Sequence, residues 1–171
     1  MTPDLSRWLL AALAASVVVI LARRRRSLSP GGALMALVMG TGLVGTTGWW
    51  AGLLLVVFFL SSSILSRIGA QRASIDQTRG AERDAVQVLA NGGVALAGAV
   101  LYPLTGAIAW TVVLAGSIAA VNADTWSTEI GRTSRILPRL VTTWRRVPAG
   151  TSGAVSPRGL ATALGGGALI A

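Results

Sequence analysis

Six apolar runs of 13 to 18 residues, separated by polar connections, constrain the fold of this chain more than any other feature. Hydrophobic residues make up 53% of the chain and charged residues only 12%, which is about half the charged share of a soluble domain. Lipid is therefore the expected solvent for much of the surface. The pattern predicts an all-α, polytopic transmembrane helix bundle of five to six helices in a single domain, residues 1–171. The runs, which are the expected helices, cover residues 5–22, 33–45, 49–65, 85–101, 104–121 and 159–171.

The last apolar run is short for a membrane span. It begins at Gly159 and stops at Ala171, and its 13 residues rise only about 20 Å as a helix, whereas a bilayer core is about 30 Å thick. We therefore expect the chain to be cut in mid-helix.

Arginine placement predicts the topology. All 15 basic residues are arginine, and passing the runs alternately across a membrane puts 14 of them on one side, in connections 23–32, 66–84 and 122–158. Arg7 is left on the other side. The positive-inside rule makes the rich side cytoplasmic and the N-terminus external. We expect an integral protein of a bacterial plasma membrane, and we do not expect nucleic acid as a partner despite the net charge of +9.

The absence of cysteine and histidine limits the available chemistry. It removes disulfides, thiolates and the commonest transition-metal ligands. It also removes imidazole as a general base, so acid–base work falls to Asp, Glu, Tyr or a bound phosphate.

A first polar cluster interrupts the run at residues 85–101. Arg83, Asp84, Gln87 and Asn91 fall within an arc of about 100° on a helix and so share one face. Lipid does not satisfy polar groups, so this face is expected to line a protein interior or a wet cavity. Helix–helix hydrogen bonding with Asp84 as a cap is the structural alternative.

A second polar cluster, NADTWSTEIG, follows the run at residues 104–121. On a regular helix Asn122, Thr125 and Glu129 share a face, whereas Asp124 lies about 140° from Glu129 and shares its side with Thr128. Both carboxylates reach one ion only if the helix unwinds here or begins near Asp124. Asp124 is equally plausible as the cap of a short helix, and oxygen ligands of this kind suit Mg²⁺.

A third element, residues 148–156, is rich in small residues and precedes the last run. Gly150, Thr151, Ser152 and Gly153 permit backbone N–H groups to converge on an anion, although such stretches are usually plain loops. Nearby arginines fit topology and anionic lipid, or a bidentate grip on phosphate. These arginines are Arg139, Arg145 and Arg146.

Together these groups suit a substrate with an apolar tail among the helices and an anionic head that meets Mg²⁺ and a soluble nucleotide. A phosphate acceptor is largely deprotonated at pH 7, because its second pKa is about 6, so it needs no general base. Positioning and charge neutralisation would then supply catalysis.

At RDAVQVLANG, NADTWSTEIG and PRLVTTWRRVPAGTSGAVS the chain resembles the domain of unknown function 92 family, which includes plant phytyl-phosphate kinase and a human transmembrane homologue. The resemblance is specific over residues 83–156 and general over the earlier runs. Relatives continue for several more helices. Ala154 stands where the family commonly has Gly. The matching residues are Asp84, Gln87, Asn91, Asn122, Asp124, Thr125, Glu129, Pro138, Thr142, Pro148, Gly150, Thr151, Gly153 and Ser156.

The resemblance implies a polyprenyl-phosphate kinase that converts phytyl or geranylgeranyl phosphate to the diphosphate, with a nucleoside triphosphate such as CTP as donor. Asp124 and Glu129 are then expected to hold Mg²⁺ and to act in catalysis together with Asp84. We expect the following residues to bind substrate or nucleotide: Arg83, Gln87, Asn91, Asn122, Thr125, Thr128, Arg139, Arg145, Arg146, Gly150, Thr151, Ser152 and Gly153.

Two other classes remain open. A transporter or channel for a small anionic solute also uses polar residues in broken helices, but it should open to both membrane faces. A non-catalytic lipid-binding or scaffold protein would use the same arginines without needing Asp124 and Glu129 together. Membrane lipid and the prenyl phosphate are the expected partners, and a homo-oligomer is left open.

Overall fold

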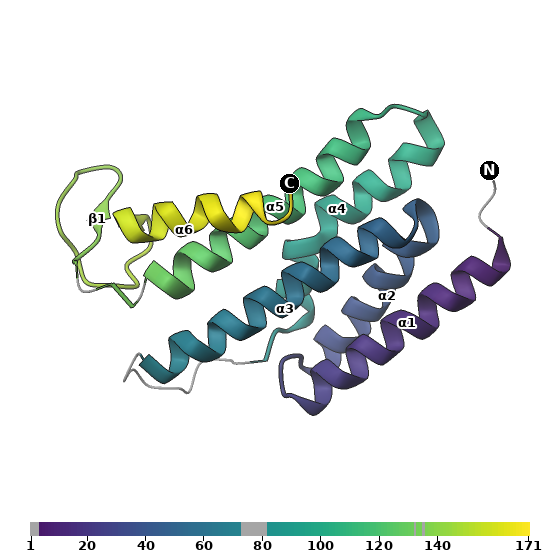
Figure 1. The fold of residues 1–171 in the computed structure, drawn as a ribbon, viewed down its shortest axis with the longest axis horizontal. Coiled ribbons are helices and arrows are strands. Elements are labelled where there is room, and N and C mark those ends of the chain that lie inside the picture. Colours follow the sequence, from purple (N-terminus) through teal and green to yellow (C-terminus); the bar gives the residue numbers. More distant parts are fainter. Residues whose placement is uncertain (1–3, 73–81, 132, 135) are drawn as a thin grey trace. The chain divides into compact units, whose positions relative to one another are not determined.

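The computed structural model describes residues 4–72, 82–131, 133–134 and 136–171. They form six helices and one two-stranded sheet, so the prediction of an all-α fold is confirmed (Figure 1). Three arginines used for the predicted topology, Arg79, Arg132 and Arg135, lie outside the described residues. The elements are α1 (Leu5–Arg24), α2 (Pro30–Thr47), α3 (Trp49–Arg72), α4 (Ala85–Thr105), α5 (Ala109–Gly131), β1 (Arg139–Leu140), β2 (Ala154–Val155) and α6 (Pro157–Ala168).

The chain divides into two compact units. Unit one comprises residues 1–57 and 78–118, and unit two comprises residues 58–77 and 119–171. The long helices α3 and α5 each give their first part to unit one and their second part to unit two.

Three helices of the described chain are long and apolar enough to cross a membrane: α1, the Trp49–Ser66 part of α3, and α4. At most 22% of the residues in each of their apolar windows are buried. Leu9, Leu13 and Leu53, for example, are more than 60% exposed. Apolar surface that is exposed in this way is stable against lipid, whereas in water it costs about 25 cal/mol per Å².

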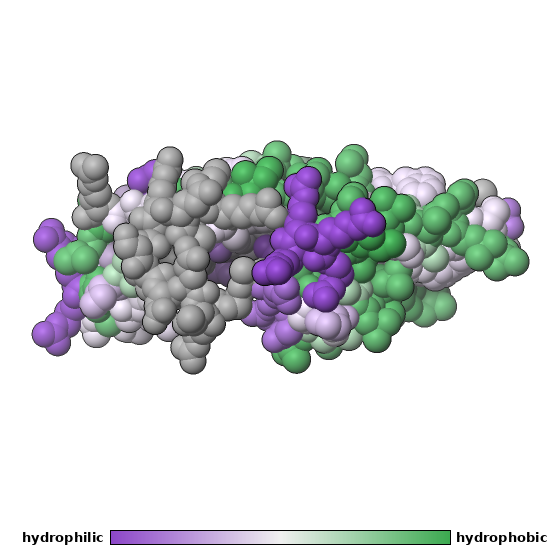
Figure 2. All heavy atoms as spheres, turned by 90° about the horizontal axis from the view of Figure 1, so that it is seen from below, coloured by the Kyte–Doolittle hydropathy of each residue, from purple (hydrophilic) through white to green (hydrophobic). Residues whose placement is uncertain are grey.

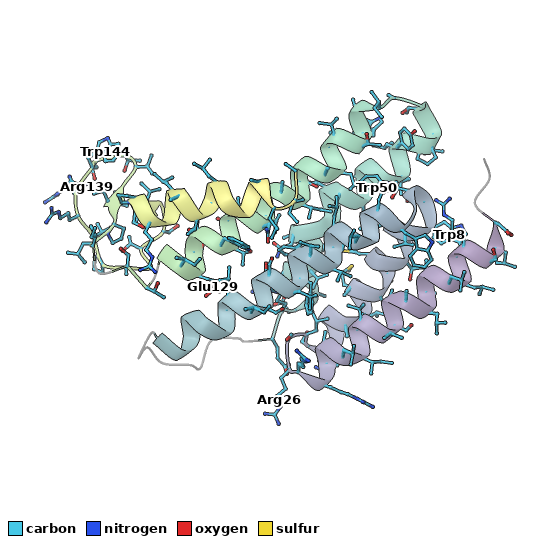
Figure 3. All side chains as sticks on the ribbon, viewed as in Figure 1. Trp8, Arg26, Trp50, Glu129, Arg139 and Trp144 are labelled. Atoms are coloured by element: carbon cyan, nitrogen blue, oxygen red, sulfur yellow. The ribbon has the colours of Figure 1, made fainter. Side chains whose placement is uncertain are left out.

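Small residues let the helices of unit one approach closely, with α2 packed against both α1 and α4. A Cβ atom on Gly45 would lie 2.3 Å from the ring of Trp8, which Figure 3 shows near the start of α1. A Cβ atom on Gly92 would lie 2.7 Å from the terminal methyl of Met39. Close packing of this kind is how helices associate where lipid removes the hydrophobic driving force.

The connection between α1 and α2 is tied to the segment that precedes α4. The Arg83 N–H donates to the Ser27 carbonyl at 3.1 Å, and the Arg83 carbonyl accepts from the Ser29 N–H at 3.0 Å. The Arg23 guanidinium lies 3.6 Å from the Glu82 carboxylate. These contacts join parts of two connections, 23–32 and 66–84, that the arginine pattern predicts on the same side of the membrane.

Prolines fall inside the observed helices, and two predicted boundaries differ for that reason. α2 begins at Pro30, earlier than the predicted Ala33, because proline fits the first helical position, where no intrahelical N–H bond is needed. α4 runs past the predicted stop at Leu101 and Tyr102, through Pro103 to Thr105, and Gly106 ends it in a left-handed conformation with φ of 68°.

The largest difference concerns α5. The sequence predicts a helix over residues 104–121 followed by a polar connection from Asn122, whereas the observed helix covers Ala109–Gly131. In its second half, Asn122 and Glu129 have hydrogen-bond partners within unit two and Asp124 is exposed, so these polar side chains do not force the helix to end. α3 likewise extends past the predicted Leu65 to Arg72, and α6 covers Pro157–Ala168 where residues 159–171 are predicted.

Glycines bring α6 against the second half of α5 in unit two. A Cβ atom on Gly166 would lie 2.9 Å from Cγ of Trp126, and one on Gly159 would lie 3.3 Å from the Ser127 carbonyl. Ser156 caps α6 by accepting from the Gly159 N–H at 3.1 Å. Between α5 and α6 lies a loop in which β1 and β2 pair antiparallel.

Candidate functional site

The second half of α5 carries a polar face that meets α3 and α6 within unit two. Asn122 is fully buried: its side-chain carbonyl accepts from the Ser61 hydroxyl at 3.0 Å, and its amide donates to the Gly166 carbonyl at 2.7 Å. The Trp126 indole donates to the Ser61 hydroxyl at 3.3 Å. Asn122, predicted to bind a ligand, therefore makes hydrogen bonds to two other helices.

Glu129 lies on the side of α5 that meets the second part of α3. Its carboxylate accepts a hydrogen bond from the Ser66 hydroxyl at 2.9 Å, and its side chain is half-buried (Figure 3). This contact leaves a second carboxylate oxygen, and it fixes the orientation of a group that the sequence predicts to act on a metal or phosphate.

Asp124 is exposed, and none of the described residues forms a hydrogen bond or ion pair with its carboxylate. Thr128, one turn further along the same side of the helix, is half-buried. The Thr125 hydroxyl donates to the Val121 carbonyl one turn earlier in α5 at 2.9 Å, so its proton is already used in a hydrogen bond within the helix. Asp124 is thus the exposed carboxylate of this polar helix, and half-buried Thr128 lies on the same side.

The regular course of α5 decides how its two carboxylates are related. Asp124 is an interior helical residue, which excludes the alternative that it caps a short helix. Asp124 and Glu129 therefore point about 140° apart around the axis. Neither condition for sharing one ion, an unwound segment or a helix that begins near Asp124, is met. Among the described residues no group of three or more Asp, Glu, Cys or His side chains gathers as a metal site.

The loop between α5 and α6 positions the predicted arginines on its surface. Arg139, Arg145 and Arg146 are all exposed, and Figure 3 shows Arg139 pointing outward from the loop. The Arg139 guanidinium donates to the Trp144 carbonyl at 2.9 Å, and this hydrogen bond joins the two ends of the turn at residues 139–144.

The glycine-rich part of this loop has the backbone conformation that glycine permits. Gly150 and Gly153 have φ of 89° and 74°, and no atom lies within 4 Å of a Cβ built on either. The Thr151 hydroxyl donates to the Pro148 carbonyl at 2.8 Å. Within the described chain no backbone hydrogen bond uses the N–H groups of Ser152 and Gly153, so these two are available as donors.

The first polar cluster lies in unit one, where part of it initiates α4. Asp84 is the N-cap residue: its carboxylate accepts from the Gln87 N–H at 2.8 Å, and the Gln87 side chain accepts from the Asp84 N–H at 3.1 Å. This is a complete capping box. Arg83 is half-buried beside it, and Asn91 is half-buried one turn beyond Gln87. Asp84 therefore caps a helix, which is the structural alternative given for it in the sequence analysis.

The site residues consequently fall into separate groups. The α5 side chains and the loop belong to unit two, whereas Arg83, Asp84, Gln87 and Asn91 belong to unit one. Within unit two, Asn122 and Glu129 lie on the face of α5 toward α3, and Asp124 lies on its exposed side.

Sequence reasoning missed the partners of this polar face. Ser61 and Ser66 hold Asn122 and Glu129, and Ser62 is fully buried between them in the chain. The available signal was the string SSSILS in the middle of an apolar run, because hydroxyls in a membrane helix mark the side that meets polar groups of another helix. Trp126 lies in the same polar string, and the sequence alone gave it no role.

Comparison with known proteins finds one matching protein family and several related proteins. The family described as "Integral membrane protein DUF92" matches residues 13–171. Protein PGR of Arabidopsis thaliana is 36% identical over 145 residues, which are 73% of this chain and 49% of that protein. An uncharacterized membrane protein of Methanocaldococcus jannaschii, MJ0933, is 30% identical over 142 residues, which are 81% of this chain and 58% of that protein.

The chain thus covers about half the length of these two relatives. No solved structure matches it significantly.

Proposed function

The chain belongs to the DUF92 family of integral membrane proteins, and on that premise we propose that it is a membrane-embedded polyprenyl-phosphate kinase. It transfers the terminal phosphoryl group of a nucleoside triphosphate, with CTP as a candidate, to phytyl or geranylgeranyl phosphate. The proposal is supported chiefly by one observation: an exposed carboxylate, Asp124, on the polar half of a helix whose first half carries exposed apolar side chains such as Val112.

The acceptor chemistry agrees with the residues that the chain has. A prenyl phosphate carries an oxygen nucleophile that is already largely deprotonated at pH 7, because its second pKa is about 6. A prenyl alcohol would need a general base, and the sequence contains no histidine. The apolar, outward-facing helix surfaces suit a substrate whose prenyl tail remains in the bilayer.

One carboxylate on α5, Asp124, suits direct coordination of Mg²⁺. The predicted pair of ligands, Asp124 with Glu129, does not, because the two lie on different sides of the helix. Asp124 is exposed, and Mg²⁺ commonly takes one or two carboxylates together with phosphate oxygens while keeping several waters. We assign Asp124 as the direct ligand of a Mg²⁺–nucleotide complex, in which the ion neutralises phosphate charge. Glu129, held by Ser66 and about 140° around the axis from Asp124, is not a ligand in the proposal and contributes only its negative charge.

In the proposal, the loop supplies positive charge and backbone N–H donors for the phosphates. Arg145 and Arg146 are exposed and neutralise charge in the proposal, while the N–H groups of Ser152 and Gly153 donate to phosphate oxygens. Asp84 and Gln87 are assigned to capping α4 instead of to catalysis, because each already bonds the other. Arg83 and Asn91 belong to unit one and have no assigned role in the proposed site.

In the proposal this site lies at the cytoplasmic membrane face, as the positive-inside rule predicts, where soluble nucleotide is available; a bacterial plasma membrane is the proposed location. Fourteen of the 15 arginines lie in the three connections assigned to that side. An asymmetry of this kind favours chemistry at one face over transport between two.

The test uses the whole chain in lipid nanodiscs with geranylgeranyl phosphate, Mg²⁺ and each of the four nucleoside triphosphates labelled at the terminal phosphate. The proposal predicts labelled geranylgeranyl diphosphate in the lipid extract with at least one donor, none without Mg²⁺, and none when geranylgeraniol replaces the phosphate. Uptake of an anionic solute by proteoliposomes without nucleotide, together with no labelled diphosphate, would establish the transporter instead.

Removing the Ser66 hydroxyl is expected to impair the proposed metal site without unfolding the protein. Ser66→Ala frees the Glu129 carboxylate, which is not a ligand in the proposal, so the loss in apparent Mg²⁺ affinity should be about two- to fivefold, as for removal of an exposed charge interaction. The Mg²⁺ concentration for half-maximal transfer should rise accordingly, with the KM for prenyl phosphate little changed. Ser66→Thr, which keeps a hydroxyl, should restore most of the affinity.

Ser63→Ala is the matched control on the same helix, because the Ser63 hydroxyl has no hydrogen-bond partner among the described residues. Equal Mg²⁺ dependence in the two alanine variants would exclude a positioning role for Ser66.

A further inference from the structure

The loop between α5 and α6 exposes large apolar side chains together with its arginines. Trp144 is 64% exposed, and Ile136, Leu137 and Val141 are each more than half exposed. Figure 2 shows hydrophobic and hydrophilic atoms side by side at the end of the molecule where β1 lies in Figure 1. No acidic residue occurs between Glu129 and the start of α6. In water, a tryptophan and three aliphatic side chains would be costly to expose in one short loop.

Backbone hydrogen bonds hold these side chains on a defined turn. The Trp144 N–H donates to the Leu140 carbonyl at 2.9 Å, and the Leu140 N–H donates to the Arg145 carbonyl at 3.0 Å. β2 pairs with the other edge of β1, where Arg139 lies opposite Val155. Trp144 itself has φ of 54°, a left-handed conformation that is unfavourable for a side-chain-bearing residue. The fold thus maintains a strained residue whose indole faces outward.

The bilayer is the surface within reach of this turn. The apolar first part of α5, residues 109–121, is the part predicted to lie in the bilayer, and its polar residues 122–131 extend about 15 Å further as helix. Ile136 follows the last residue of α5 by five positions, which limits their separation to about 18 Å. The loop is therefore tethered to this membrane by a short polar stretch of helix and five further residues, so the headgroup layer lies within its reach.

We propose that the 136–155 loop docks on the headgroup layer of the protein's own bilayer, with Trp144 and its apolar neighbours in the interface and Arg145 and Arg146 on anionic lipid phosphates. Tryptophan is enriched at the membrane–water interface because its ring is amphipathic. Each arginine near an anionic lipid surface strengthens binding to that surface. The charge of the loop selects an anionic surface in preference to a neutral one. Arg145 and Arg146 are also the side chains that the proposed function gives to nucleotide phosphate, so the docking is tested without nucleotide.

The absence of native cysteine allows a clean test with single labels. Thr143→Cys, next to Trp144 and exposed, and Ser152→Cys, at the glycine-rich turn of the same loop, each carry an environment-sensitive fluorophore. The full chain is placed in nanodiscs of phosphatidylcholine with or without phosphatidylglycerol, and a fraction of the lipids carries a quencher near the headgroup.

The proposal predicts a blue shift and strong quenching at position 143 in phosphatidylglycerol nanodiscs, and much weaker effects at position 152. Trp144→Ala should reduce the quenching at position 143. Arg145→Ala with Arg146→Ala should lower the docked-to-free ratio in anionic lipid by roughly 10-fold or more, with little change in phosphatidylcholine.

A label at position 143 that remains as water-exposed as the label at position 152 in both lipids would overturn the proposal. Quenching at position 143 that is insensitive to phosphatidylglycerol and to the arginines would likewise exclude anionic lipid as the occupant. Neither outcome depends on kinase activity, so failure here leaves the proposed function untouched.

Discussion

Replacing Asp124 with asparagine is expected to lower the rate of diphosphate formation by roughly 100-fold or more, because direct metal coordination is worth several kcal/mol of charge stabilisation. Asparagine keeps the size of the side chain but removes the negative charge that holds Mg²⁺. Asp124 is exposed, and its carboxylate has no hydrogen-bond partner among the described residues, so the helix should form normally. The measurement is initial transfer rate in nanodiscs, with circular dichroism to verify folding.

Asp4→Asn is the matched control for this substitution. Asp4 is also an exposed carboxylate, but it lies at the start of α1, which the arginine pattern predicts on the opposite membrane face. Its rate should stay within about twofold of the parent, as expected for a surface change away from the site. An Asp124→Asn variant that keeps most of its activity, or an equal loss in Asp4→Asn, would contradict the assigned role of Asp124.

Gly32→Ala is expected to destabilise the protein by about 2 kcal/mol or more, the upper part of the range for overpacking a close contact. A Cβ atom on Gly32 would lie 2.1 Å from the Arg83 carbonyl oxygen. That oxygen belongs to backbone that Ser27 and Ser29 hold by hydrogen bonds, so no side-chain rotation relieves the clash. We expect a lower melting temperature in detergent and faster proteolysis in the α1–α2 connection.

The neighbouring glycine provides the control, since both belong to the first turn of α2. A Cβ atom on Gly31 would lie 3.5 Å from Cβ of Ala85, which is ordinary van der Waals contact. Gly31→Ala should therefore be neutral or slightly stabilising, because alanine is favoured over glycine in helices by up to about 1 kcal/mol. Equal melting temperatures for the two variants would show that the Ser27–Arg83 junction is not tightly packed.

Apolar runs and arginine placement were sufficient to predict the membrane-helix architecture. The run from Leu5 corresponds to α1, that from Trp49 to α3 and that from Ala85 to α4, since long apolar segments have only one stable form in a bilayer. The pairing of Arg83 with the Ser27–Ser29 segment agrees with connections that share one membrane side.

The candidate site was less predictable, because its geometry depends on partners that are distant in sequence. Asn122 and Glu129 stand out as polar residues near an apolar run, but nothing local identifies Ser61 and Ser66 as their partners. These contacts let α5 continue as a regular helix, and that continuity separates Asp124 from Glu129 around the axis. In the sequence, Asp124 and Glu129 look like the ligands of one metal ion. In the structure Asp124 is exposed, whereas Glu129 is half-buried and bonded to Ser66.

The most direct test of the account is whether a metal–nucleotide complex binds next to Asp124. A spin label on Ala120→Cys, an exposed position one turn before Asp124, would lie about 6 Å from it along the helix axis. Leu9→Cys on α1 carries the reference label. Mn²⁺ with nucleoside triphosphate should broaden the spectrum of the label at position 120 strongly and that at position 9 hardly at all, and Asp124→Asn should abolish the difference. Equal broadening at both positions, or none at position 120 with saturating Mn²⁺–nucleotide, would contradict the account.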